Sequence, residues 1–194
     1  NGGNRITIDF MNALPGVNYP DSIGSGVVRT PRGVLHCGDC INDGSGPYAA
    51  SVWTLFTNDF GVNGEGRLCY PVFEILGNHD GGSGCVPQQG VSARTRCRNG
   101  LTAVSTNGLH YSFDWERVHF VCLNLYGGSG DDPSRGFRQI WNDPQDSLGF
   151  LRADLEKHVG SSGRPVVVYQ HYGFDGFSAG WGWWSSNDRT RLYQ

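Results

Sequence analysis

Three short apolar segments of the sequence are each followed at once by polar residues of the kinds that bind metal ions. Asp39 follows the first segment, the run Asn78-His79-Asp80 follows the second, and His171 follows the third. Sheet enzymes gather their reactive groups at the carboxyl ends of strands, so we expect these side chains to meet. Carboxylate and amide oxygens combined with imidazole suit Zn, Mn or Fe. The sequence therefore predicts a site for divalent metal ions.

Each of these residue types suits a different role at a two-metal site. A carboxylate can bridge two ions, which is the role that we expect for Asp39. Asn78 offers an amide oxygen and His171 offers a ring nitrogen, so both are interpreted as metal ligands. His79 stands next to Asn78, where it is placed to protonate a leaving oxygen, and Asp80 is placed to orient its ring. We therefore interpret His79 and Asp80 as the catalytic residues.

Less specific interpretations of the same residues also exist. Asp favours turns, so Asp39 taken alone is more typical of a turn than of a metal site, and a histidine at a strand end such as His171 is often only a hydrogen-bonding partner. The run Cys37-Gly38-Asp39-Cys40 matches a redox C-x-x-C motif. That motif normally opens a helix, whereas the polar and glycine-rich residues 42–46 break one. The metal interpretation rests on the three groups taken together.

Strands and helices alternate along the chain. Apolar runs predict strands over 34–37, 71–76, 109–114, 117–125 and 165–169, the third and fourth of these forming a hairpin. Apolar spacing and end signals predict helices over 5–13, 47–60 and 146–159. This order is typical of an α/β layered domain with a mixed sheet.

The polar groups also resemble the motifs of a known family. Gly38-Asp39 followed by Gly77-Asn78-His79-Asp80 is similar to the GD and GNH[D/E] signatures of calcineurin-like metallophosphoesterases, at a similar spacing of about forty residues. The hairpin at 111–124 and the segment 170–174 resemble the blocks that follow, so the resemblance covers residues 34–175. It implies a four-layer αββα sandwich that hydrolyses a phosphoric ester with a hydroxide activated by two divalent metal ions. It also implies that Asp39 bridges the ions, that Asn78 and the histidine block bind the second one, and that His79 is the acid or contacts the phosphate.

Two blocks of the family pattern are missing from this sequence. The nearest match to the opening D-x-H block is Asp9-Phe10-Met11, which lacks the histidine, and nothing matches the closing G-H-x-H block. In many relatives the ligand of the histidine block directly follows the strand, where this chain has Gln170. A shift of one residue to His171 would turn the side chain to the other face of a strand.

We therefore expect one partial phosphoesterase domain over residues 1–194 that binds one metal ion or none by itself. In this interpretation the chain is the core portion of a longer hydrolase domain. The alternative is a catalytically inactive relative that serves as a structural or binding module in a larger extracellular assembly.

Composition limits the partners of the chain. Its 194 residues carry a net charge of −3, whereas nucleic-acid-binding proteins usually show a basic face. No apolar stretch approaches the length that spans a bilayer, so no membrane partner is expected. The expected partner is a phosphoester substrate, whose identity the sequence does not specify.

The cysteines and glycines suggest where the chain works. Six cysteines in a glycine-rich chain favour an oxidising compartment, so we expect a secreted or extracellular protein. The expected disulfide joins Cys85 to Cys97, because it would close a glycine-rich loop. A Gly- and Trp-rich segment at 176–184 is interpreted as an aromatic patch packed on the sheet, with a substrate-facing wall as the alternative.

Overall fold

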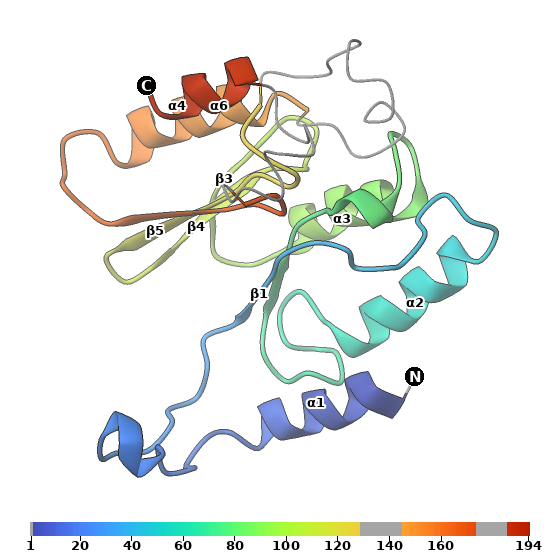
Figure 1. The fold of residues 1–194 in the computed structure, drawn as a ribbon, viewed down its shortest axis with the longest axis vertical. Helices are drawn as coiled ribbons and strands as arrows, with labels where there is room; N and C mark the ends of the chain where they lie inside the picture. Colours follow the sequence, from blue (N-terminus) through green and yellow to red (C-terminus); the bar gives the residue numbers. More distant parts are fainter. Residues whose placement is uncertain (1, 129–144, 174–185) are drawn as a thin grey trace.

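The computed structural model describes residues 2–128, 145–173 and 186–194, which form two sheets with helices on their outer sides (Figure 1). The strands are β1 (Val34–His36), β2 (Val72–Glu74), β3 (Leu101–Val104), β4 (Tyr111–Trp115), β5 (Val118–Cys122) and β6 (Val166–Tyr169). The α-helices are α1 (Gly2–Asn12), α2 (Ala49–Asp59), α3 (Val86–Cys97), α4 (Ser147–His158) and α6 (Ser186–Leu192). Two short 3-10 helices, η1 (Asp21–Ile23) and η2 (Asn78–Asp80), lie in connecting segments.

The two sheets differ in size and in strand direction. β1 and β2 pair in parallel, with Val34 opposite Val72, and form the two-stranded sheet. The four-stranded sheet has the order β3-β4-β5-β6, in which β5 pairs antiparallel with β4 and parallel with β6. The second sheet is therefore mixed, as the sequence predicts.

The core between the two sheets is aromatic. Phe73 and Ile75 from the β2 segment pack with Phe113 of β4 and Phe120 of β5. The rings of Phe73 and Phe113 stack with centroids 3.9 Å apart, and those of Phe113 and Phe120 with centroids 5.0 Å apart. These contacts bury the inner faces of both sheets against each other.

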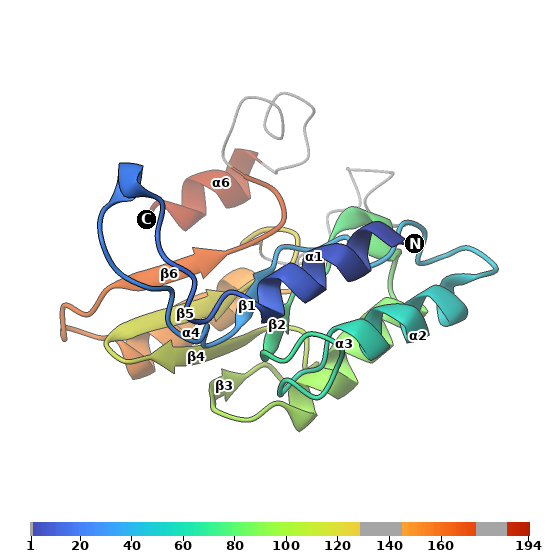
Figure 2. The ribbon, with the colours of Figure 1, turned by 90° about the horizontal axis from the view of Figure 1, so that it is seen from below.

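Helices cover the outer faces. Val121 and Leu123 point away from the aromatic core and pack on Leu148 and Leu151 of α4, because alternate residues of a strand face opposite sides. Figure 2 shows α1, α2 and α3 gathered beside β1 and β2, with α4 beside β5. The resulting order of helix, sheet, sheet and helix confirms the expected four-layer αββα fold.

Every strand and helix that the sequence predicts is present, but the segment between the second strand and the hairpin is not the loop that we expected. It contains α3, for which Cys85 is the N-cap and Cys97 the last residue. A helix of 12 residues separates its ends by about 18 Å at 1.5 Å per residue, whereas a disulfide needs Cα atoms within about 7 Å. The expected disulfide between Cys85 and Cys97 is therefore wrong, and all six cysteines are free.

Two further elements were not predicted from the sequence, and one predicted feature lies outside the described residues. β3 and α6 were not predicted. The Gly- and Trp-rich segment at 176–184 lies outside the described residues. Within the described ranges, no helix has both the length and the apolar character needed to cross a membrane.

Candidate active site

The first part of the site is the turn that follows β1. Gly38 and Asp39 have φ angles of 91° and 54°, so two consecutive residues lie in the left-handed region. This conformation is easy for glycine, and Asp adopts it more readily than most other residues, so the Gly38-Asp39 pair suits a tight turn. The turn leaves the Asp39 side chain partly exposed, with its carboxylate directed at the end of β2.

Gly77 allows the ends of the two parallel strands to come together. A Cβ atom at Gly77 would lie 2.1 Å from Oδ1 of Asp39 and 2.4 Å from its backbone nitrogen. Any larger residue would therefore push Asp39 away. The backbone N–H of His79 then donates to Oδ1 of Asp39 at 3.0 Å, which fixes one oxygen of the carboxylate.

Asp80 has a different role from the one that we expected. Its buried carboxylate accepts backbone N–H groups of Gly77 at 2.7 Å, Cys40 at 3.2 Å and Ile41 at 3.0 Å. Burial raises the pKa of Asp80 to about 6, although these three N–H donors act in the opposite direction. Asp80 thus ties the turn after β1 to the turn after β2.

A backbone carbonyl, and not the Asp80 carboxylate, orients the ring of His79. Its Nδ1 lies 2.9 Å from the carbonyl oxygen of Asn42. A carbonyl only accepts hydrogen bonds, so Nδ1 carries a proton and Nε2 is the nitrogen that can gain or lose one. The expectation that Asp80 orients this ring is therefore corrected, while the exposed position of His79 beside Asn78 is retained.

His171 completes the arrangement from the four-stranded sheet. Its Nδ1 lies 2.7 Å from the carbonyl oxygen of Cys37, and its Nε2 lies 3.0 Å from Oδ1 of Asn78 and 3.5 Å from Oδ1 of Asp39. Gln170 is engaged elsewhere, since its side chain bonds the backbone of Gly127 and Tyr172. The structure therefore brings His171, and not Gln170, to Asn78.

The chemistry of the three donors fits a cation. With the Nδ1 proton of His171 on the Cys37 carbonyl, Nε2 faces Oδ1 of Asn78 and Oδ1 of Asp39. A neutral ring would offer the Nε2 lone pair, so that one nitrogen and two oxygens form a donor set that a divalent ion accepts. A histidine that ligates a metal usually donates its other N–H to a carbonyl or carboxylate, as His171 does to Cys37. The residues present thus suit one divalent ion.

The donor set is nevertheless small. Among the described residues, no group of three or more His, Cys, Asp or Glu side chains converges to hold a metal ion. Here an amide, from Asn78, is needed as the third donor. Asp39, Asn78 and His171 are therefore candidate ligands for a single ion within the described part of the chain.

Sequence reasoning missed three groups that shape the site. Two are the carbonyls of Cys37 and Asn42, which residue type cannot reveal because every residue has a backbone carbonyl. The third is Asn124, which is buried and contacts both the β2 end and His171. A polar amide inside the apolar run 120–126 was the available signal, but we assigned that residue only to a hairpin strand.

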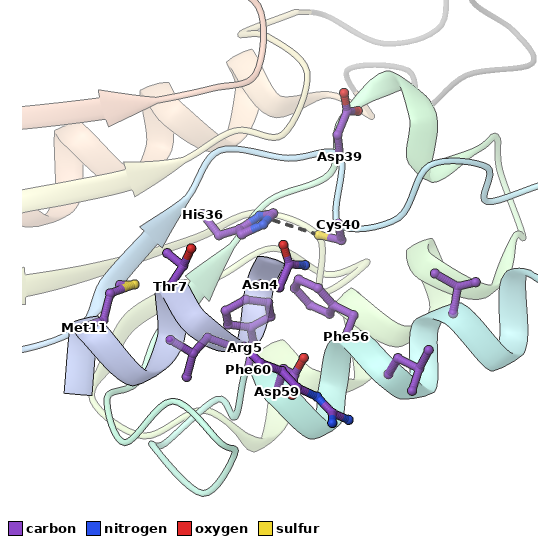
Figure 3. Close-up of a pocket in the computed structure, with 13 residues that line it drawn as sticks. Asn4, Arg5, Thr7, Met11, His36, Asp39, Cys40, Phe56, Asp59 and Phe60 are labelled. Atoms are coloured by element: carbon purple, nitrogen blue, oxygen red, sulfur yellow. Dashed lines mark hydrogen bonds between the residues drawn. The ribbon is translucent and has the colours of Figure 1, made fainter. Parts of the chain in front are cut away.

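A pocket of about 330 Å³ lies between α1, α2 and β1 (Figure 3). His36 and Cys40 line it, with Nδ1 and Sγ 3.9 Å apart, and burial lowers the pKa of His36. Asp39 is also part of its lining, but Figure 3 shows that side chain directed away from His36 and Cys40. The converging donors of Asp39, Asn78 and His171 are thus arranged beside this pocket and not around it.

Comparison with known proteins gives one match. A family model described as calcineurin-like phosphoesterase matches residues 22–192. Searches of curated proteins and of solved structures found no match. The matched range includes every residue of the site described above.

Proposed function

Because the chain belongs to the calcineurin-like phosphoesterase family over residues 22–192, we propose that it supplies the active site of a metal-dependent hydrolase of phosphoric esters. Family membership supports phosphoester hydrolysis, and the family generally uses divalent metal ions. One observation carries the proposal for this chain. Asp39, Asn78 and His171 come from three distant segments, yet both oxygens lie within 3.5 Å of the same ring nitrogen.

Each residue of the site has a defined task in this proposal. Asp39, Asn78 and His171 would hold one divalent ion. The ion, when bound, supplies Lewis-acid chemistry by lowering the pKa of water and neutralising charge on the phosphoryl oxygens. His79, with its Nδ1 proton held by Asn42, gives a proton from Nε2 to the leaving oxygen. Asp80 keeps the two turns in register and does not touch the substrate.

The first test combines metal content with hydrolysis. Purified protein is analysed for Zn, Mn and Fe and is assayed with an aryl phosphate monoester and an aryl phosphate diester in the presence of added Mn²⁺ or Zn²⁺. We expect bound metal and turnover of at least one ester. The absence of both bound metal and hydrolysis would overturn the proposal and would favour a catalytically inactive module.

Two variants and one control assign the roles. Asp39→Asn keeps the shape and tolerates the left-handed turn, and it should abolish metal binding and hydrolysis together. His79→Gln should retain the metal and lower kcat by about 10²- to 10⁴-fold, the usual effect of losing a general acid. Asp43→Asn is the control, because Asp43 is exposed in the same loop and its Oδ1 accepts the N–H of Ser45 at 3.2 Å. Full activity in His79→Gln would refute its role as the acid.

A further inference from the structure

We propose that Asn124 is the positioning residue that sets the separation of Asn78 and His171, an inference that rests on the proposed function of this site. Asn124 lies two residues beyond β5 and is 1% exposed. Its side chain bonds Leu76, Leu109 and His110, and none of the three converging donors. Its effect is exerted through the two segments that it holds.

The side chain of Asn124 fixes the end of the β2 segment. Its Oδ1 accepts the backbone N–H of Leu76 at 2.8 Å, two residues before Asn78. Its Nδ2 donates to the carbonyl of Leu109 at 2.8 Å and lies 3.1 Å from Nδ1 of His110. The amide group is therefore held on two sides and cannot rotate without losing a buried hydrogen bond.

The backbone of Asn124 fixes the segment that carries His171. Its carbonyl accepts the N–H of His171 at 2.7 Å, and the next residue repeats this contact, with the Leu125 carbonyl accepting from Tyr172 at 2.8 Å. One residue thus joins the two-stranded sheet, through Leu76, to the segment after β6 of the four-stranded sheet. The 3.0 Å contact between Asn78 and His171 spans these same two segments.

Asparagine suits this position for a physical reason. Asn124 has a φ of 60°, a conformation that few residues other than Gly, Asn and Asp adopt readily. Asp would keep the acceptor for Leu76 but lose the donor for Leu109, and Gly would lose both. Because a displacement of about 1 Å can cost about 10²-fold in rate, a looser connection between Asn78 and His171 should weaken the site.

The test compares two variants with a control of similar kind. Asn124→Gly removes the whole amide while tolerating the left-handed φ, and Asn124→Asp keeps the acceptor for Leu76. Ser112→Ala is the control, because it removes another buried hydrogen bond, from Ser112 Oγ to Asp154 at 2.6 Å, in a different part of the four-stranded sheet. Circular dichroism melting of all variants checks that any loss of stability is comparable.

Two readouts separate a positioning role from a general loss of stability. The first is the NMR signal of the His171 imidazole and of the Asn78 side-chain amide in metal-free protein. Both should shift in Asn124→Gly, shift less in Asn124→Asp and stay unchanged in Ser112→Ala. The second is the Kd for Zn²⁺ or Mn²⁺, which should rise by about 10- to 100-fold in Asn124→Gly and not in the control.

The outcomes distinguish this inference from the proposed function. Unchanged His171 and Asn78 signals in Asn124→Gly would overturn the positioning role, as would an equal loss of metal affinity in Ser112→Ala. Wild-type protein that binds no metal would refute the proposed function, while the NMR comparison still decides the role of Asn124. Should Asn124→Gly fail to fold, the same comparison with Asn124→Asp decides it.

Discussion

Replacing Glu74 by glutamine tests how the strand that leads into the Asn78-His79-Asp80 turn is held in place. Glu74 is fully buried at the end of β2. Its carboxylate bonds Nε of Arg94 at 2.7 Å and Nη2 of Arg98 at 2.8 Å, both from the region of α3. Glu74→Gln keeps the shape but removes the negative charge that balances these two guanidinium groups.

The expected cost follows from the burial of the partners. The side chain of Arg98 is 0% exposed and that of Arg94 is 13% exposed, so water cannot replace the lost carboxylate. Removing one partner of a buried ion pair costs about 3–5 kcal/mol in the free energy of unfolding. For a domain of this size, this corresponds to a decrease in Tm of about 6–20 °C.

The pH dependence gives a second, independent check. Burial by itself would raise the pKa of Glu74, but Arg98 and Arg94 outweigh it and hold the pKa below the usual value of 4.5. The folded-state pKa is depressed, so this stabilisation is fully present above the ordinary pKa and is lost as pH falls through the folded-state value. The difference between wild type and Glu74→Gln should therefore shrink as the pH is lowered below about 4.5.

Urea unfolding followed by tryptophan fluorescence, at pH 7 and at several lower values, measures both effects. Asp9→Asn serves as the control, because the ion pair between Asp9 and Arg67 is exposed and should contribute little to the free energy of unfolding. A Glu74→Gln protein within about 1 kcal/mol of wild type at pH 7 would refute the reasoning. A difference that does not change with pH would show that the ion pairs are not its source.

Two further predictions address the turn between the strands and the cysteines. In Gly77→Ala the new Cβ would lie 2.1 Å from Asp39, so this variant should abolish hydrolysis and lower the free energy of unfolding in urea by about 1–3 kcal/mol. Gly127→Ala is the control and should do neither, because its Cβ would meet only a flexible Leu192 atom at 3.1 Å. Wild-type activity in Gly77→Ala would contradict the geometry of this turn. Because no disulfide is present, a reducing agent should leave Tm unchanged. A thiol reagent should modify native protein at the exposed cysteines, while the buried Cys122 should react only after unfolding, since burial raises its pKa. The exposed cysteines are Cys37, Cys69 and Cys97. A clear drop in Tm on reduction would restore the case for a disulfide.

Local patterns in the sequence were sufficient for the strands and for the order of the motifs. An apolar run that ends in Gly-Asp or Gly-Asn-His-Asp marks both a strand and the place where its chemistry begins. Because β1 and β2 are parallel, their ends meet at one edge of a sheet, and the proximity of Asp39 to Asn78 follows from that pairing. The family could be inferred for the same reason, since its signature residues are contiguous in the chain.

Local signals also failed where a segment was rich in glycine. The segment containing α3, which we expected to be a glycine-rich loop, includes Pro87 and Gly90. Pro87 lies in the first turn of the helix, where its missing N–H has no cost, and Gly90 allows Trp53 of α2 to pack closely, because a Cβ there would lie 2.4 Å from the indole ring. The error over α3 led directly to the error over the disulfide.

Only the tertiary structure decided the roles within the site. The role of Asp80 depends on three backbone N–H groups, two of which lie about 40 residues away in the chain. The placement of His171 in preference to Gln170 depends on carbonyls of Cys37 and Asn124, which belong to different sheet segments. A sequence fixes which side chains are available and the local periodicity that forms each element. Which backbone groups they meet depends on how distant elements pack, because those contacts form only when the two sheets come together.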